Sequence, residues 1–148
     1  MAKVLAVASA GGHWEQMMVL RGVLDAHDVH FATTAADLPA REGIAGATVL
    51  PDCNRNEILN STRCLFAALA LVLRLRPEVV ISTGALPGFC CILIGRIMGA
   101  RTLWLDSVAN AENLSMCGKF SRRVAHVCLT QWDHLATPDG PHYAGSLL

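Results

Sequence analysis

Gly11, Gly12 and His13 form the first candidate reactive loop, directly after an apolar run over residues 4–8. A helical pattern over residues 14–25 follows them. Glycines let the backbone approach a ligand closely, and the free N–H groups at the start of a helix attract negative charge. An imidazole beside such a loop exchanges a proton near neutral pH. The pattern therefore predicts an anion site with a general base, although a tight turn followed by a capping histidine has the same sequence.

Two further loops carry hydroxyl groups, a carboxylate and an amide after apolar runs over residues 78–82 and 101–105. Parallel strands end at one edge of a sheet, so we expect these loops to converge with the first one on a single crevice. The side chains and glycines that could bind or react there are Ser82, Thr83, Gly84, Asp106, Ser107 and Asn110.

Short apolar runs alternate with helix-length segments along the whole chain. The runs lie at residues 3–8, 28–32, 47–50, 78–82, 101–105 and 126–130. The helical segments lie at residues 14–25, 57–76, 87–99 and 115–124, with a short one at 35–43. This alternation predicts βαβ units with right-handed crossovers. We expect an α/β fold, a Rossmann-like doubly wound parallel sheet, in one domain over residues 1–148.

The composition argues against two classes of site. The chain has 12 basic and 12 acidic residues, so no overall field attracts nucleic acid and we expect no nucleic-acid partner. Its six cysteines include no CxxC pair, and no signal peptide precedes the first strand-like run. These features predict free thiols in a cytoplasmic protein and no metal site.

The stretch over residues 64–73 is apolar all round a helix and has arginines on both sides. Ten helical residues reach about 15 Å, half of the roughly 30 Å hydrocarbon core of a bilayer. We therefore expect this stretch not to span a membrane. It either packs against the sheet or lies in a membrane interface. The flanking arginines and a separate basic patch favour the membrane interface. That patch consists of Lys119, Arg122 and Arg123.

A final group of residues adds a more specific pattern. Residues 114–119 read Leu-Ser-Met-Cys-Gly-Lys, and Gln131 and Trp132 follow the next strand-like run, before a Tyr143-x-Gly145 ending. Together with the Gly-Gly-His and Ser-Thr-Gly loops, this pattern resembles the Alg-fourteen-like family, which includes the PssD-type subunits of bacterial polysaccharide synthesis. The resemblance covers nearly the whole chain. Members of that family are acceptor-binding, membrane-recruiting subunits of split glycosyltransferases.

The resemblance implies one half of a GT-B glycosyltransferase, equivalent to its N-terminal half. The chain would be a subunit of an inverting, metal-independent, two-component enzyme in polysaccharide or lipid-linked oligosaccharide synthesis. It would bind a polyprenyl-diphosphate-linked sugar acceptor and recruit a small donor-binding partner that carries the UDP-sugar. The chain contains no Asp-x-Asp pair, and we expect no cofactor. The resemblance also implies peripheral attachment to the cytoplasmic face of a membrane.

In this interpretation, His13 is the first candidate for the catalytic base and Asp106 is the second. The predicted acceptor and phosphate contacts are Gly11, Gly12, Ser82, Thr83, Gly84, Ser107 and Asn110. Gln131 and Trp132 are expected to shape the crevice or the partner interface. The chain departs from the pattern at Asn110, where the family often has a basic residue.

Two other functions stay open. The chain could be a non-catalytic membrane scaffold for a self-sufficient glycosyltransferase, in which case replacing His13 would leave activity unchanged. It could also be a stand-alone Rossmann nucleotide-binding module. That alternative expects dinucleotide binding, yet the chain has no GxGxxG motif, and Thr33 and Thr34 stand where an acidic residue would bind the ribose.

Overall fold

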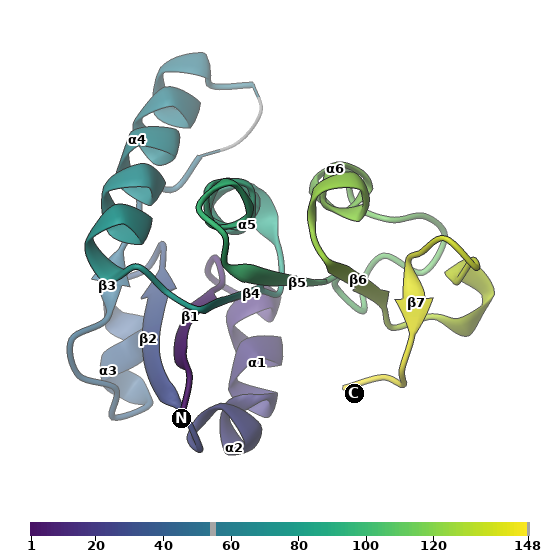
Figure 1. The fold of residues 1–148 in the computed structure, drawn as a ribbon, viewed down its shortest axis with the longest axis horizontal. Helices are drawn as coiled ribbons and strands as arrows, with labels where there is room; N and C mark the ends of the chain where they lie inside the picture. Colours follow the sequence, from purple (N-terminus) through teal and green to yellow (C-terminus); the bar gives the residue numbers. More distant parts are fainter. Residues whose placement is uncertain (54–55, 148) are drawn as a thin grey trace.

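Seven parallel strands form one sheet (Figure 1). The computed structural model describes residues 1–53 and 56–147. The order in the sheet is β3-β2-β1-β4-β5-β6-β7, so the chain runs outward from β1 on one side and from β4 on the other. This order confirms the Rossmann-like doubly wound prediction and puts the topological switch between β1 and β4. The strands are β1 (Lys3–Val7), β2 (Asp28–Thr33), β3 (Thr48–Val49), β4 (Val79–Ser82), β5 (Arg101–Leu105), β6 (Val127–Thr130) and β7 (His142–Tyr143).

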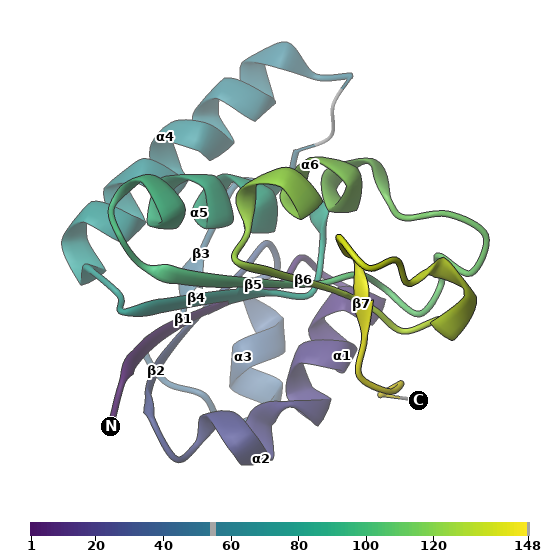
Figure 2. The ribbon, with the colours of Figure 1, turned by 45° about the vertical axis from the view of Figure 1, so that its right-hand side comes forward.

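Helices cover both faces of the sheet (Figure 2). One face carries α1 (Gly12–Val19), α2 (Arg21–Leu24) and α3 (Asp37–Arg41). The other carries α4 (Ile58–Leu75), α5 (Ala85–Ile97) and α6 (Met116–Val124), and a short 3-10 turn, η1 (Asp133–Leu135), precedes β7. The pattern over residues 14–25 is two helices, not one. The break lies at Leu20, whose N–H bonds to the Met17 carbonyl three residues back at 3.1 Å and so tightens the last turn of α1.

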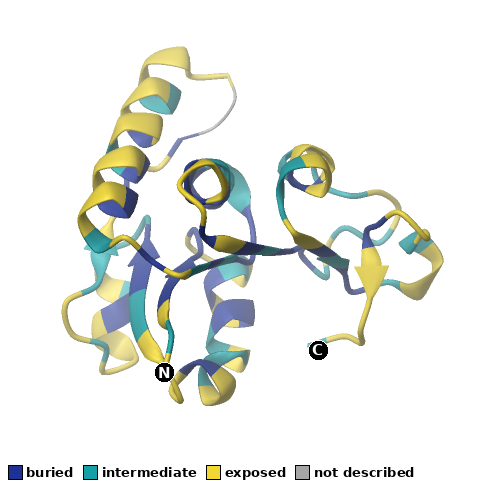
Figure 3. Ribbon diagram, in the orientation of Figure 1, coloured by how far each residue is buried: buried dark blue, intermediate teal, exposed yellow. Residues whose placement is uncertain are grey.

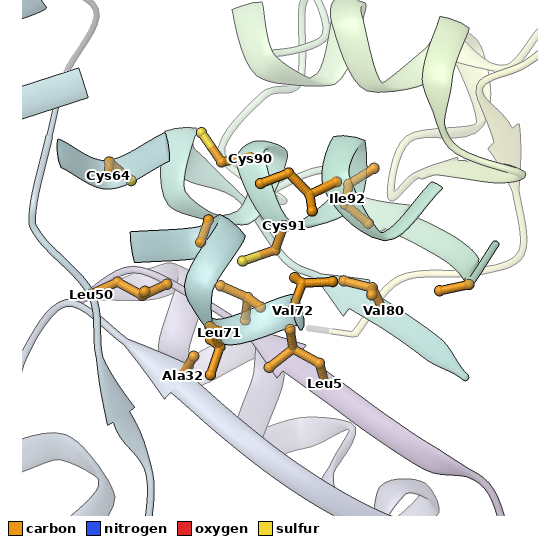
Figure 4. Close-up of a cluster of buried hydrophobic side chains, with 14 of the residues drawn as sticks. Leu5, Ala32, Leu50, Cys64, Leu71, Val72, Val80, Cys90, Cys91 and Ile92 are labelled. Atoms are coloured by element: carbon orange, nitrogen blue, oxygen red, sulfur yellow. The ribbon is translucent and has the colours of Figure 1, made fainter. Parts of the chain in front are cut away.

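The alternation of side chains along β1 divides the core into two clusters. Leu5 and Val7 belong to the cluster under α4 and α5, which Figure 4 shows in close-up. Val4 and Ala6 belong to the cluster with α1, α2 and Phe31. Strand β1 is therefore buried on both faces, as its continuous apolar run indicates.

All six cysteines are free thiols, and five of them are buried. Burial raises the pKa of the Cys91 thiol above its ordinary value. Burial also raises the pKa of the Cys128 thiol, to about 12. These two thiols stay protonated at neutral pH and pack as small hydrophobic side chains. The prediction of free thiols is confirmed.

Helix α4 is apolar on two sides. Its 18 residues give a length of about 27 Å, so by length and composition alone it is long enough to cross a membrane. The helix is longer than the apolar stretch over residues 64–73, because it extends beyond that stretch at both ends, so its length alone does not exclude a membrane span. That the segment does not span a membrane stays a prediction. One side of α4 packs in the core through Cys64, Ala68, Leu71 and Val72. The other side is largely exposed, including Ile58 and Phe66, as Figure 3 shows for the helix as a whole.

The register of the sheet brings four loops to the same level. Val7 of β1 aligns with Ser82 of β4, Ser82 with Trp104 of β5, and Trp104 with Cys128 of β6. The loops that follow these strands therefore begin side by side at the carboxyl edge. They contain most of the residues singled out from the sequence, and helices α1, α5 and α6 start from three of them.

Candidate functional site

His13 lies at the start of α1 and is half-buried. Its Nδ1 atom is 3.0 Å from the carbonyl oxygen of Thr83, in the loop after β4. Because a carbonyl only accepts, Nδ1 donates this hydrogen bond, and in the neutral ring Nε2 is then left with a free lone pair. The same ring lines the cavity described below. His13 therefore has the tautomer that a general base needs.

Gly84 makes room for the His13 ring. A Cβ atom at this position would lie 2.2 Å from Nδ1 of His13 and 2.3 Å from Cε1. The φ angle of Gly84 is +146°, which side chains rarely allow. Thr83 adds a second link, since its Oγ1 donates to the backbone carbonyl of His13 at 2.6 Å. The loops after β1 and β4 are thus joined in both directions, and only glycine at position 84 permits it.

A cavity of about 280 Å³, lined by both polar and apolar side chains, lies beside His13. The first turns of α1, α5 and α6 all contribute to its wall. Helix N-termini carry partial positive charge, so three of them around one cavity favour an anion such as a diphosphate. The lining residues are His13, Ala85, Ser107, Ala109, Asn110, Ser115, Met116 and Cys117. The prediction that the loops after β1, β4 and β5 converge is therefore confirmed in the geometry.

Asp106 is buried and holds the N-terminus of α6. Its Oδ1 accepts from Trp104 Nε1 at 3.0 Å and from Ser115 Oγ at 2.6 Å, and its Oδ2 accepts from Ser115 N–H at 2.9 Å. Ser115 in turn caps α6, because its Oγ accepts from the N–H of Gly118. A Cβ on Gly118 would approach Asp106 Oδ1 to 2.6 Å, so this packing also requires glycine. The role of Asp106 as a base stays a prediction, and its present contacts suit a positioning role better.

The hydroxyl groups of Ser82 and Thr83 do not face the cavity. Both residues are fully buried. Ser82 Oγ accepts from the N–H of Gly84 at 3.2 Å, and Thr83 Oγ1 is committed to His13. These side chains turn into the fold and shape the loop that holds the His13 ring. The predicted contact of Ser82 and Thr83 with ligand oxygens through backbone and hydroxyl groups stays a prediction.

Ser107 and Asn110 line the cavity, and their predicted contact with the acceptor stays a prediction. Ser107 Oγ accepts from Gln16 Nε2 at 3.1 Å and from the N–H of Ala109 at 3.2 Å, which leaves its own hydrogen to donate. Asn110 is half-buried, and its N–H bonds to the Ser107 carbonyl.

Gly11 and Gly12 are exposed at the start of α1. Gly11 has φ +75° and ψ −139°, a conformation that favours glycine. Their role in anion binding stays a prediction.

Gln16 is a site residue that the sequence reasoning missed. It is buried on α1, one turn after Gly12. Its Oε1 accepts from the N–H of Val108 at 3.1 Å and from the side-chain amide of Gln131, while its Nε2 donates to Ser107. The signal available in the sequence was a polar residue, three positions after His13, on an otherwise apolar helix face.

Gln131 and Trp132 lie in the loop after β6 and form hydrogen bonds to the loop after β5. Gln131 is buried, and its Nε2 also donates to the Asp106 carbonyl at 3.0 Å, while its Oε1 accepts from the N–H of Leu147. Trp132 Nε1 donates to the Val108 carbonyl at 2.7 Å. These contacts hold the loops after β5 and β6 together, and the expected roles in shaping the crevice or the partner interface stay predictions. Within residues 1–53 and 56–147, no three histidine, cysteine or acidic side chains gather as a metal-ligand group.

No family model and no curated protein matches the chain. Solved structures do match. MurG from Acinetobacter baumannii has a TM-score of 0.76 at 15% identity, over 99% of this chain and 46% of its own. A UDP-N-acetylglucosamine 2-epimerase from Rickettsia bellii has a TM-score of 0.76 at 14% identity, over 99% of this chain and 45% of its own. A glycosyltransferase from Rickettsia africae has a TM-score of 0.59 at 14% identity, over 83% of this chain and 34% of its own.

The chain thus spans less than half the length of the structures it matches. At such low identity the likeness shows the fold alone, which is that of a GT-B half-domain. The predicted equivalence to half of a GT-B protein is confirmed at the level of the fold. Membership of the Alg-fourteen-like family stays a prediction.

Proposed function

We propose that the chain is the acceptor-binding subunit of a two-component, inverting, UDP-sugar-dependent glycosyltransferase. The observation that carries the proposal is His13, whose Nε2 is free to accept a proton beside a cavity walled by three helix N-termini. The cavity suits the diphosphate of a polyprenyl-diphosphate-linked sugar. His13 Nε2 takes the proton of the acceptor hydroxyl, whose oxygen bonds to the anomeric carbon as the bond to UDP breaks.

The fold does not distinguish a transferase from an epimerase, because a protein of each kind matches this chain with the same TM-score of 0.76. The exposed surface supports the transferase. Ile58 and Phe66 on α4 are 82% and 64% exposed, and Arg63 and Arg74 lie on the same helix. An apolar helix face flanked by cations suits a membrane interface, where a lipid-linked acceptor resides and a free sugar nucleotide does not.

Two partners belong to this proposal. The UDP-sugar is carried by a separate donor-binding GT-B half, and the chain attaches peripherally to the cytoplasmic face of the membrane through α4. A positioned base contributes about 10² to 10⁴ in rate, so the chain supplies both acceptor positioning and part of the catalysis.

The test begins with the purified chain in an assay with lipid-linked acceptor and radiolabelled UDP-sugars. We expect no transfer by the chain alone, and transfer once the donor-binding protein that co-purifies with it is added. Turnover by the chain without a partner would overturn the two-component assignment. Full activity of a His13→Ala complex would instead support the non-catalytic scaffold.

A further inference from the structure

An apolar pocket of about 340 Å³ lies next to the His13 cavity of the proposed site. Leu86 and Phe89 of α5 line it together with Phe120 of α6. The Phe89 and Phe120 rings lie 6.0 Å apart between centroids. The full lining is Cys53, Ala85, Leu86, Phe89, Met116, Cys117 and Phe120.

The pocket and the His13 cavity share three lining residues, Ala85, Met116 and Cys117. These residues come from the first turns of α5 and α6, so the two hollows are parts of one groove between these helices. The groove carries hydrogen-bonding side chains at the His13 end and is apolar at the Phe120 end. A molecule that lies along it must have a charged or hydroxylated part and a hydrocarbon part.

The apolar half of the groove is partly open to water. Phe120 is 51% exposed and Met116 is 47% exposed. At the inner end, burial raises the pKa of the Cys53 thiol, which is therefore uncharged at neutral pH. Exposed large apolar side chains that line a hollow next to a polar site mark a ligand-binding surface.

We propose that this pocket binds the isoprene units next to the diphosphate of the lipid-linked acceptor. The inference rests on the proposed function and assigns the isoprenoid chain of the acceptor a binding site separate from that of the diphosphate. With the diphosphate at the three helix N-termini, the chain of the lipid lies against the paired rings of Phe89 and Phe120. Figure 2 shows that α4, α5 and α6 share one side of the sheet, so the lipid leaves the pocket on the side that carries the exposed face of α4. A nucleotide sugar has no hydrocarbon chain to occupy this pocket.

The experiment compares methyl diphosphate with geranyl diphosphate, both kept monomeric, by isothermal titration calorimetry on the full chain. Burial of the geranyl group strengthens binding by at least about tenfold over methyl diphosphate. Phe120→Gln removes most of this gain while leaving the affinity for methyl diphosphate unchanged. Met116→Gln serves as a second pocket variant, and Ile97→Gln at the far end of α5 is the matched control, because Ile97 is also an exposed apolar residue but lies outside the pocket.

Thiol labelling gives a second readout. Cys117 is the one cysteine in the described part of the chain that is not buried, and it lies where the two halves of the groove meet. Geranyl diphosphate should slow its alkylation by N-ethylmaleimide more than methyl diphosphate does at equal occupancy.

Three outcomes count against the inference. Equal affinity for the two ligands, or a gain that survives in Phe120→Gln, overturns the pocket assignment and leaves the proposed function standing. Failure of both ligands to bind overturns the proposed function itself, and the pocket assignment with it.

Discussion

Replacing Gly84 by alanine tests whether the loop after β4 holds the proposed base in place. The new Cβ would lie 2.2 Å from Nδ1 of His13, well inside van der Waals contact. The φ angle of +146° at this position is one that non-glycine residues rarely adopt, so the alanine also strains the backbone. The ring must therefore swing away from the Thr83 carbonyl, and the hydrogen bond of 3.0 Å that sets its tautomer is lost.

The size of the effect follows from these contacts. The ring must retreat by roughly 1 Å, and a displacement of that size in a catalytic group costs about 10² in rate. Backbone strain costs about 1–3 kcal/mol, and loss of the hydrogen bond costs about 0.5–1.5 kcal/mol. We therefore expect Gly84→Ala to lower the free energy of unfolding by about 2–4 kcal/mol and turnover of the assembled enzyme by about two orders of magnitude.

Two measurements follow the change. Long-range ¹H–¹⁵N correlation spectra report which nitrogen of His13 carries the proton, and urea titration reports the free energy of unfolding. Gly99→Ala is the matched control, because Gly99 has φ +90° but nothing within 4 Å of an added Cβ. It should lose stability to backbone strain alone, with an unchanged His13 spectrum. A His13 spectrum and a turnover that are unaltered in Gly84→Ala would refute the reasoning.

Four other predictions concern different parts of the molecule. His13→Ala lowers turnover of the complex by at least about tenfold in steady-state assays, with little change in melting temperature because the ring is half-exposed; unchanged turnover would move the base elsewhere. Gln16→Leu lowers the free energy of unfolding in urea by about 2–4 kcal/mol, because three partners on two loops, Ser107, Val108 and Gln131, lose their hydrogen bonds; a loss below about 1 kcal/mol would contradict the network. Phe66→Glu reduces co-sedimentation with anionic vesicles, whereas Val23→Glu, similarly exposed on the opposite face of the sheet, does not; equal binding by both variants would remove α4 from the membrane contact. Burial, and to a smaller extent the charge of Arg74, holds the pKa of His30 below its ordinary value of 6.5. Just below pH 6.5 the unfolded chain therefore binds a proton at His30 that the folded chain does not. Stability should therefore fall as the pH drops below about 6.5, and His30→Gln should flatten this dependence in urea titrations at several pH values.

The fold was largely predictable from local sequence. Apolar runs alternating with helix-length segments predict a parallel sheet, and six of the seven strands lie within or across those runs. The exceptions have local physical causes. Strand β7 has only two residues, His142 and Tyr143, and carries no apolar run. The helical pattern over residues 14–25 gives no sign of the break at Leu20, because that side chain fits the helical periodicity as well as its neighbours.

By itself, the sequence determined which loops would meet, because a parallel sheet collects the carboxyl ends of its strands at one edge. Only the tertiary structure decided what each side chain does there. The hydrogen bond between His13 and Thr83 joins residues 70 positions apart, and the bond between Gln16 and Gln131 joins residues 115 apart. Such pairs depend on strand register and on the direction in which each side chain leaves its loop. Neither is encoded in local spacing. The sequence therefore did not predict that the Ser82 and Thr83 side chains point into the fold, or that Gln16 forms hydrogen bonds in the site.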